Sequence, residues 1–365
     1  MNSRKRLLAA LSGDETDRIP ITEIGVWPET RLRWINEGMP DNISVDDYFG
    51  LDKIEVFTFD SSLQIPVKTI EDNDDFITTT DSNGCTREYH KNSYGASKFI
   101  KASIINMDSW KNVRNRLKPD LSRLEGCNTH FGFGHKLPGT MKERYLKTKN
   151  EDIFTVYSPT EPCWFFLNLL GEEDALINFA SDPDFAESVF SDYTDFNLKQ
   201  LEEVYSAGYT FDALWVFSDL CYKNGMLFSP KFYRERLLPY HRSFFNRAAT
   251  LDMKVIYHCD GYIGEFLPLL IDAGVDCVQP LEVRAGNDIR DYIRQYPGKI
   301  SYMGNINADA LASGREVIEN EVKNKVLEAK KTRRYIYHSD HSVPDTVSLE
   351  NFKFSIELAF KYGVY

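Results

Sequence analysis

Two stretches of the chain place a histidine and a carboxylate at the end of a short apolar run. The first, KVIYHCDG, carries His258 and Asp260, and the second, RYIYHSDHS, carries His338, Asp340 and His341. Imidazole nitrogens and carboxylate oxygens bind divalent metals, and a catalytic zinc site uses three protein ligands and an open position. The pattern indicates one site held by His258 and Asp260, with Asp340 or His341 as the third ligand. The alternative, which spacing alone favours slightly, is that the histidines form ordinary hydrogen bonds and the aspartates cap helices.

Short runs rich in β-branched and aromatic residues alternate with helical periodicity, which is typical of βα units on a parallel sheet. Eight strands are predicted, at residues 19–24, 53–59, 153–158, 213–217, 254–258, 276–280, 300–303 and 334–338. Eight such units close a barrel, so the predicted fold class is α/β, a (β/α)8 TIM barrel. The active site of such a barrel lies at the carboxyl ends of its strands.

Polar residues follow every predicted strand, which would crowd one mouth of the barrel with carboxylates, imidazoles and amides. They are Glu23, Asp60, Glu161, Asp219, His258, Asp260, Gln279, Glu282, Asn305, Asn307, His338, Asp340 and His341. The turn after the fourth strand adds Tyr222 and Lys223, which could position a substrate. Single members of this set have a plain alternative, because Asp, Glu and Asn also form turns and cap helices in βα loops.

The interval between the second and third predicted strands does not follow the βα period. The stretch DFITTTDSNGCTREYH alternates around Asn83-Gly84, which predicts a hairpin, and a short helix is predicted at 108–117. An irregular segment that contains Gly and His follows at 126–140. We expect residues 66–150 to form an excursion over one mouth of the barrel, with residues 126–150 covering the active site. Residues 1–365 are expected to form a single domain.

The overall composition argues against several classes of partner. The 365 residues carry a formal net charge of −12, which disfavours binding to nucleic acid or an anionic membrane. No apolar run approaches the roughly 20 residues of a membrane span. The six cysteines are scattered without a CxxC pair, a usage typical of a reduced, cytoplasmic protein rather than a disulfide scaffold.

Five segments resemble the uroporphyrinogen decarboxylase-like superfamily. They are SRKRLLAALSGDETDRIPI, YKNGMLFSPKFYRERLLPYH, YHCDGYIGEFLPLLIDAGVDCVQPLE, MGNINADALASG and YIYHSDHSVPDTVSLENF. The resemblance runs nearly end to end and implies a (β/α)8 barrel. True uroporphyrinogen decarboxylases use no metal and hold their porphyrinogen through an N-terminal Arg-Gln-Ala-Gly-Arg motif. The corresponding stretch here, EIGVWPETR, lacks that motif.

The chain is more similar to the other branch of the superfamily, the cobalamin-dependent methyltransferases. Members of that branch hold zinc through a His-x-Cys pair and a further Cys after the last strand. His258 and Asp260 match the pair, with Asp in place of Cys, and His341 falls at the last position. The resemblance implies a zinc site of His258, Asp260 and His341, and its harder ligands make iron or manganese an alternative.

The implied activity is a metal-dependent transfer of a methyl group from a small methylated substrate to a corrinoid protein. The substrate would be of the methyl ether or methylamine type, and the corrinoid would arrive on a partner. Glu161, Asp219 and Glu282 would position the substrate or supply a proton, and Asp340 would orient a liganding imidazole. The predicted substrate contacts are Glu23, Tyr222, Lys223, Asn305 and His338.

Two other functions stay open at this point. One is a metal-independent decarboxylase that acts on a smaller carboxylated substrate than uroporphyrinogen. The other is a binding protein without turnover. Barrels of this superfamily often pair, so a homodimer is also an expectation.

Overall fold

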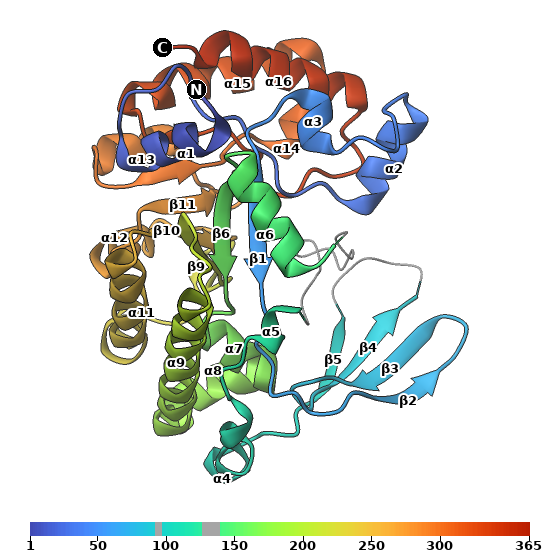
Figure 1. The fold of residues 1–365 in the computed structure, drawn as a ribbon, viewed down its shortest axis with the longest axis vertical. Coiled ribbons are helices and arrows are strands. Elements are labelled where there is room, and N and C mark those ends of the chain that lie inside the picture. Colours follow the sequence, from blue (N-terminus) through green and yellow to red (C-terminus); the bar gives the residue numbers. More distant parts are fainter. Residues whose placement is uncertain (92–96, 126–138) are drawn as a thin grey trace.

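The centre of the molecule is a curled sheet of seven parallel strands (Figure 1), seen in a computed structural model that describes residues 1–91, 97–125 and 139–365. Its strand order is β1-β6-β7-β10-β11-β12-β13. The strands are β1 (Ile54–Thr58), β6 (Phe154–Ser158), β7 (Ala213–Phe217), β10 (Lys254–Cys259), β11 (Cys277–Pro280), β12 (Ser301–Met303) and β13 (Tyr335–Ile336). Seven of the eight predicted strands are therefore confirmed, with small differences at their ends.

The strand predicted at residues 19–24 is wrong as a continuous strand. Pro20 has no N–H to donate to a ladder, and the N–H of Ile21 donates instead to the Asp52 carboxylate at 2.9 Å. The segment nevertheless lies between the two edges of the sheet. Tyr337 donates its N–H to Pro20 at 2.9 Å, and Asp52 donates its N–H to Ile21 at 2.7 Å, so the segment bridges the last strand and the residues before β1.

Both faces of the parallel sheet are buried, as expected for strands covered by βα crossovers. Alternate residues such as Val156, Trp215, Ile256, Met303 and Ile336 form the smaller of two buried clusters, together with Leu7 and Leu11 of helix α1 (Ser3–Ser12). The intervening residues belong to the larger cluster, which includes the surrounding helices. Because side chains alternate along a strand, this pattern separates an inner face from a helix-covered outer face.

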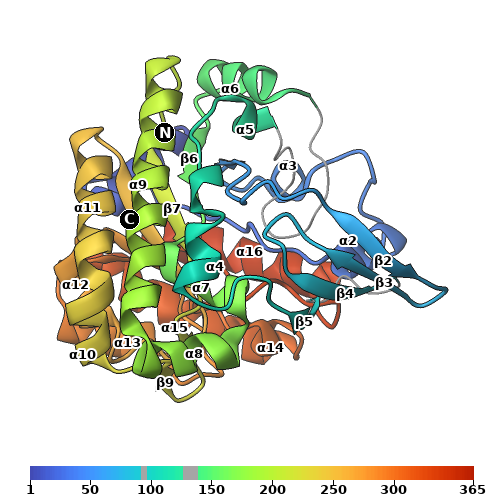
Figure 2. The same cartoon turned by 90° about the horizontal axis from the view of Figure 1, so that it is seen from below.

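The helices cover the outer face of the sheet, apart from α1, which packs against the inner-face cluster; Figure 2 shows α9 and α11 side by side. Besides α1, they are α2 (Pro28–Asn36), α3 (Val45–Phe49), α4 (Met107–Lys111), α5 (Ser122–Glu125), α6 (Met141–Asn150), α7 (Pro162–Leu170), α8 (Glu172–Ser181), α9 (Pro183–Ser206), α10 (Pro230–Phe232), α11 (Leu238–Thr250), α12 (Leu267–Ala273), α13 (Ile289–Gln295), α14 (Ala308–Leu311), α15 (Arg315–Ala329) and α16 (Leu349–Gly363). Short helical turns lie at η1 (Arg114–Arg116), η2 (Tyr233–Leu237, a π-helix) and η3 (Lys330–Thr332). No helix in the described residues is long and apolar enough to cross a membrane.

A second, antiparallel sheet occupies the interval between β1 and β6 and lies to one side of the parallel sheet (Figures 1 and 2). Its strands are β2 (Lys68–Asp72), β3 (Phe76–Thr80), β4 (Thr86–His90) and β5 (Lys98–Lys101). The turn from β3 to β4 contains Asn83 and Gly84, and Gly84 has a φ of 80°. Most of the segment expected to cover the active site, at 126–138, lies outside the described residues. A two-stranded ribbon of β8 (Cys221–Tyr222) and β9 (Gly225–Met226) follows β7.

Candidate functional site

The register of three neighbouring strands brings polar and aromatic side chains together at the carboxyl end of the sheet. His258 on β10 pairs with Phe217 on β7 and with Gln279 on β11. Residues that pair across a parallel ladder point to the same face of the sheet. These three side chains therefore continue the inner face formed by Trp215 and Ile256.

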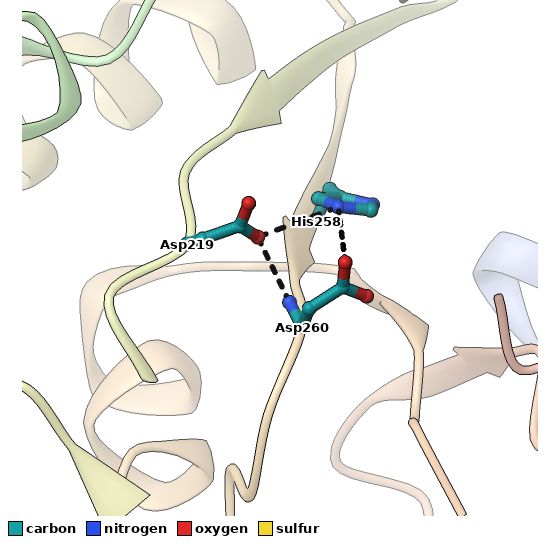
Figure 3. Close-up of side chains that lie close together, drawn as sticks. All are labelled: Asp219, His258 and Asp260. Atoms are coloured by element: carbon teal, nitrogen blue, oxygen red, sulfur yellow. Dashed lines mark hydrogen bonds and ion pairs between the residues drawn. The ribbon is translucent and has the colours of Figure 1, made fainter. Parts of the chain in front are cut away.

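His258 and two aspartates form a compact cluster just beyond these strand ends (Figure 3). The His258 Nε2 atom lies 3.5 Å from Asp219 Oδ1 and 3.9 Å from Asp260 Oδ2. The Asp260 N–H donates to Asp219 Oδ1 at 3.0 Å, which fixes the two loops against each other. Asp219 thus joins the predicted pair of ligands, although the sequence suggested a catalytic carboxylate at this position.

Two neighbours orient the His258 imidazole. Its Nδ1 donates a hydrogen bond to Gln279 Oε1. The other nitrogen, Nε2, therefore faces the aspartates, with a lone pair when the ring is neutral and with a proton when it is charged. The Phe217 ring stacks on the imidazole with centroids 4.3 Å apart and an interplanar angle of 12°. The ring is held on its face and at one nitrogen, which leaves the other nitrogen pointed into the cluster.

Burial and charge act in opposite directions on the three groups. Burial lowers the pKa of His258, but the contact with Asp219 and the charge of Asp260 outweigh it and raise this pKa to about 9. Burial raises the pKa of Asp260. Burial alone would also raise the pKa of Asp219, but the contact between Asp219 and His258 outweighs it, and the Asp219 pKa is lowered. Without a metal, an imidazolium therefore balances one of the two carboxylates.

The cluster fits a divalent metal ion. His258 Nε2 and Asp260 Oδ1 are buried atoms that form no hydrogen bond within the described chain. One ligand atom from each of the three residues lies within 4.8 Å of the others. Tetrahedral ligands about 2.1 Å from a zinc ion are roughly 3.4 Å apart, close to the separations seen here. One nitrogen and two carboxylate oxygens suit zinc, and such a hard set also suits iron or manganese.

His341, the third predicted ligand, lies at the margin of this cluster. Its Nε2 is 3.7 Å from Asp260 Oδ2, and 46% of its side chain is exposed. The structure therefore brings His341 beside one ligand atom, while Asp219 is the residue that meets both His258 and Asp260.

Two hollows flank Asp260. The inner cavity has a volume of about 200 Å³. It is lined by Ile24, Gly25, Trp27, Phe217, His258, Asp260, Gln279, Pro280, His338, His341 and Ser342. The outer hollow, of about 410 Å³, is lined by Cys221, Tyr222, Lys223, Asp260, Gly261, Glu282, Arg284 and Ala285.

Besides Asp260, three predicted site residues line the outer hollow: Tyr222, Lys223 and Glu282. Glu282 accepts the N–H of Gly261 at 2.9 Å. A side chain at Gly261 would meet the backbone of Cys221 and Tyr222 at 2.8 Å, so glycine lets the two ligand loops approach closely here.

Glu161 lies in the protein interior and makes structural contacts. It accepts the N–H groups of Cys163 and Trp164 at the start of α7, at 2.9 and 2.6 Å. His241 Nε2 lies 2.7 Å from Glu161 Oε1, and the Ser218 hydroxyl donates to Glu161 Oε2 at 2.8 Å. With 1% of its surface exposed, Glu161 holds α7, α11 and the loop before Asp219 together.

Glu23 and His338 hold the loop after β13. Glu23 accepts the N–H groups of Gly25 at 3.1 Å and Ser339 at 3.2 Å. His338 donates from Nδ1 to the Ser339 carbonyl at 2.7 Å and accepts the N–H of Ile24 at Nε2, at 3.2 Å. His338 lines the inner cavity, but both of its ring nitrogens already contact the backbone.

Asp340 and Asn305 connect the loops on the opposite side of the mouth. Asp340 accepts the N–H groups of Val283 and Ala308, each at 2.9 Å. Asn305 donates to the carbonyls of Leu281 and Asn287 and accepts the N–H of Ile289. Asp340 does not contact a ligand imidazole, and neither residue lines the inner cavity.

The sequence did not single out Phe217, and it named Gln279 only as one of many polar residues at the strand ends, without a role. Each ends a predicted strand beside the one that carries His258, so the alignment of strand ends was the available signal. The register that pairs them with His258 depends on tertiary packing.

The chain is similar to known proteins both in sequence family and in fold. A family model described as Uroporphyrinogen decarboxylase (URO-D) matches residues 168–362, which include all three cluster residues. A solved methyltransferase from Methanosarcina mazei is similar over 99% of this chain and 99% of that chain, with 14% identity and a TM-score of 0.64. That likeness shows a shared fold.

Weaker structural likenesses involve two xylanases. An intracellular xylanase from Thermoanaerobacterium saccharolyticum has 13% identity, covers 65% of this chain and 78% of that chain, and gives a TM-score of 0.35. Xylanase B from Clostridium stercorarium has 11% identity, covers 63% of this chain and 77% of that chain, and gives a TM-score of 0.33. No curated protein matches the chain.

Proposed function

The chain belongs to the uroporphyrinogen decarboxylase family, and we propose that it is a metal-dependent methyltransferase. It moves a methyl group from a small methylated compound, of the methyl ether or methylamine type, to a corrinoid carried by a partner protein. The observation that carries the proposal is the Asp219–His258–Asp260 cluster, with its unpartnered ligand atoms beside a small cavity. The Methanosarcina mazei methyltransferase, which has the same fold over its full length, supports it.

Asp219, His258 and Asp260 would hold the metal, with zinc as the first candidate and iron or manganese as alternatives. The bound metal would supply a Lewis acid that polarises the heteroatom of the methyl donor. Gln279 orients the His258 ring so that Nε2 is presented to that ion. Phe217 keeps the ring from rotating and excludes water from its face.

The remaining predicted residues divide between the two hollows and the loops. His341 lines the inner cavity and is half exposed, so its Nε2 can hold or release a proton beside the leaving group. Tyr222, Lys223 and Glu282 form the approach through the outer hollow. Glu161, Glu23, Asn305, His338 and Asp340 maintain the loop positions through the backbone contacts described above.

No lysine or arginine is among the residues that line the inner cavity, and the His258 imidazole already faces two carboxylates, which weighs against the decarboxylase alternative. A carboxylated substrate requires cationic partners, and a porphyrinogen carries several such groups. Lys223 and Arg284 line the outer hollow instead, and Arg284 is paired with Asp309.

The direct test is methylation of cob(I)alamin under anaerobic, reducing conditions, followed by the absorbance of methylcobalamin. Zinc-loaded protein is expected to transfer a methyl group from an ether or amine donor, and His258→Ala is expected to lose this activity. Transfer that survives both chelation and His258→Ala would refute the metal mechanism. Absence of transfer from every donor, with metal content shown to be one equivalent, would refute the methyltransferase.

A further inference from the structure

Ser218 lies in the chain between two residues that contact His258. Phe217 stacks on the His258 ring, and Asp219 faces His258 Nε2. The Ser218 side chain is fully buried. Because successive side chains of an extended segment point to opposite faces, Phe217 and Asp219 are directed into the site, and the Ser218 side chain is directed away from it into the protein interior.

The Ser218 backbone fixes the ends of two strands against each other. Its N–H donates to the His258 carbonyl at 3.1 Å. This bond continues the parallel pairing of β7 with β10 by one residue beyond Phe217, which is the last residue of β7. The position of Ser218 relative to β10 therefore sets how far Asp219 reaches toward the imidazole.

The Ser218 hydroxyl is held by the buried carboxylate of Glu161. The hydroxyl donates to Glu161 Oε2 at 2.8 Å, and the same oxygen accepts the N–H of Trp164 at 2.6 Å. The Trp164 ring packs edge-on against the Phe217 ring, with centroids 5.9 Å apart. One carboxylate oxygen thus supports both neighbours of His258: Asp219 through Ser218, and Phe217 through Trp164.

The other oxygen of Glu161 keeps this carboxylate in place. Glu161 Oε1 accepts the N–H of Cys163 at 2.9 Å and lies 2.7 Å from His241 Nε2. The second nitrogen of His241 lies 3.0 Å from the Tyr233 hydroxyl. A buried carboxylate whose two oxygens each contact two partners is rigidly held, so Ser218 has a fixed acceptor.

Metal sites are sensitive to supports of this kind. Ligand distances must match their preferred values to within about 0.2 Å, and loss of a group that orients a ligand typically lowers metal affinity about tenfold to a hundredfold. The Asp219 side chain accepts the Asp260 N–H, and the main chain of Asp219 is held at the preceding residue, Ser218.

We propose that Ser218 and Glu161 are positioning residues of the metal centre. Their buried hydroxyl–carboxylate contact sets the reach of Asp219 and keeps the Phe217 ring on the face of His258. Glu161, which the sequence suggested as a catalytic carboxylate, therefore acts on the ligands and not on the substrate. The inference rests on the metal site of the proposed function and does not depend on the methyl donor.

The test compares Ser218→Ala with Ser301→Ala in the full chain. Ser301 is also fully buried, and its hydroxyl donates to the Ala10 carbonyl at 3.0 Å, at the amino end of β12. Zinc affinity is measured by competition with a chromogenic chelator, and ligand geometry is measured by the visible absorption spectrum of the cobalt(II)-loaded protein.

Ser218→Ala should lower zinc affinity about tenfold to a hundredfold and should change the cobalt(II) spectrum, because the ligand atoms move. Ser301→Ala loses a buried hydrogen bond of the same kind and should change neither. Wild-type zinc affinity with an unchanged cobalt(II) spectrum in Ser218→Ala would overturn the proposal, as would an equal loss of affinity in Ser301→Ala.

Two further variants test whether the contact with Glu161 is responsible. Ser218→Thr keeps the hydroxyl and should recover most of the zinc affinity that Ser218→Ala loses. Glu161→Gln should lower zinc affinity at least as much as Ser218→Ala, and the double variant should show no further loss, because both changes remove one contact. Wild-type zinc affinity in Glu161→Gln, or a further tenfold loss in the double variant, would overturn the proposal even if Ser218→Thr does not fold.

The positioning role and the methyltransferase fail independently. Loss of zinc affinity in Ser218→Ala, in a protein that transfers no methyl group from any donor, would refute the methyltransferase and leave the positioning role intact. Methyl transfer by the wild type, with an unaltered metal site in Ser218→Ala, would refute the positioning role and leave the methyltransferase intact.

Discussion

Replacing Asp219 should weaken metal binding far more than replacing His341. In the structure, Asp219 faces His258 Nε2 at 3.5 Å and binds the Asp260 N–H, whereas His341 approaches only Asp260, at 3.7 Å. The sequence alone suggested the opposite assignment, with His341 as a ligand and Asp219 as a catalytic group. The two variants therefore test whether the tertiary arrangement defines the ligand set.

The magnitudes follow from charge and exposure. Two unit charges about 4 Å apart at an effective dielectric constant near 20 interact by about 4 kcal/mol. Removing the Asp219 charge in Asp219→Asn should accordingly reduce zinc affinity about a thousandfold. His341 is 46% exposed and can act only through Asp260, so His341→Ala should reduce affinity about tenfold, as for outer partners of metal ligands.

The assay is competition for zinc against a chromogenic chelator at fixed pH. His258→Ala serves as the positive control, and Glu282→Gln serves as the matched carboxylate control because Glu282 lines the outer hollow and binds the Gly261 N–H. Glu282→Gln should bind zinc like the wild type. Retained zinc affinity in Asp219→Asn, together with a loss in His341→Ala as large as in His258→Ala, would refute the geometric assignment.

Three further predictions follow from the same contacts. Gln279→Leu should lower zinc affinity about tenfold to a hundredfold in the chelator assay, and Gln279→Glu, which keeps an acceptor for Nδ1, should recover most of it. In metal-free protein the His258 pKa of about 9 exceeds its unfolded value of about 6.5, so its stabilisation is complete below about pH 6.5 and is lost as the pH rises through 9. Urea unfolding should show this loss, of at most about 3 kcal/mol, in the wild type and not in His258→Ala. Glu161→Gln should lower the free energy of unfolding by about 3 kcal/mol, because His241 and two helix N–H groups lose a buried carboxylate partner. The control Glu173→Gln, at an exposed position, should change the free energy of unfolding little. Equal stability of the two variants would contradict the structural role of Glu161.

The local pattern predicted most of the parallel sheet. Alternating apolar runs and helical periods placed seven strands correctly, because a strand buried on both faces needs a short, β-branched or aromatic run wherever it lies. The prediction failed at residues 19–24, where Pro20 and the side chain of Asp52 replace ladder hydrogen bonds. That replacement involves residues more than thirty positions apart, so no local window contains it.

The sequence by itself determined that His258 and Asp260 follow a buried strand and lie near the same point, since two residues separated by one position cannot be far apart. It also placed Asp219, Gln279 and His341 at strand ends. Only the tertiary structure decided which of these meet: the parallel register sets Phe217 and Gln279 beside His258, and a loop hydrogen bond draws Asp219 to Asp260. Ligand geometry depends on shifts of a few ångströms between separate chain segments, and such shifts are fixed by the packing of the whole sheet rather than by any local spacing.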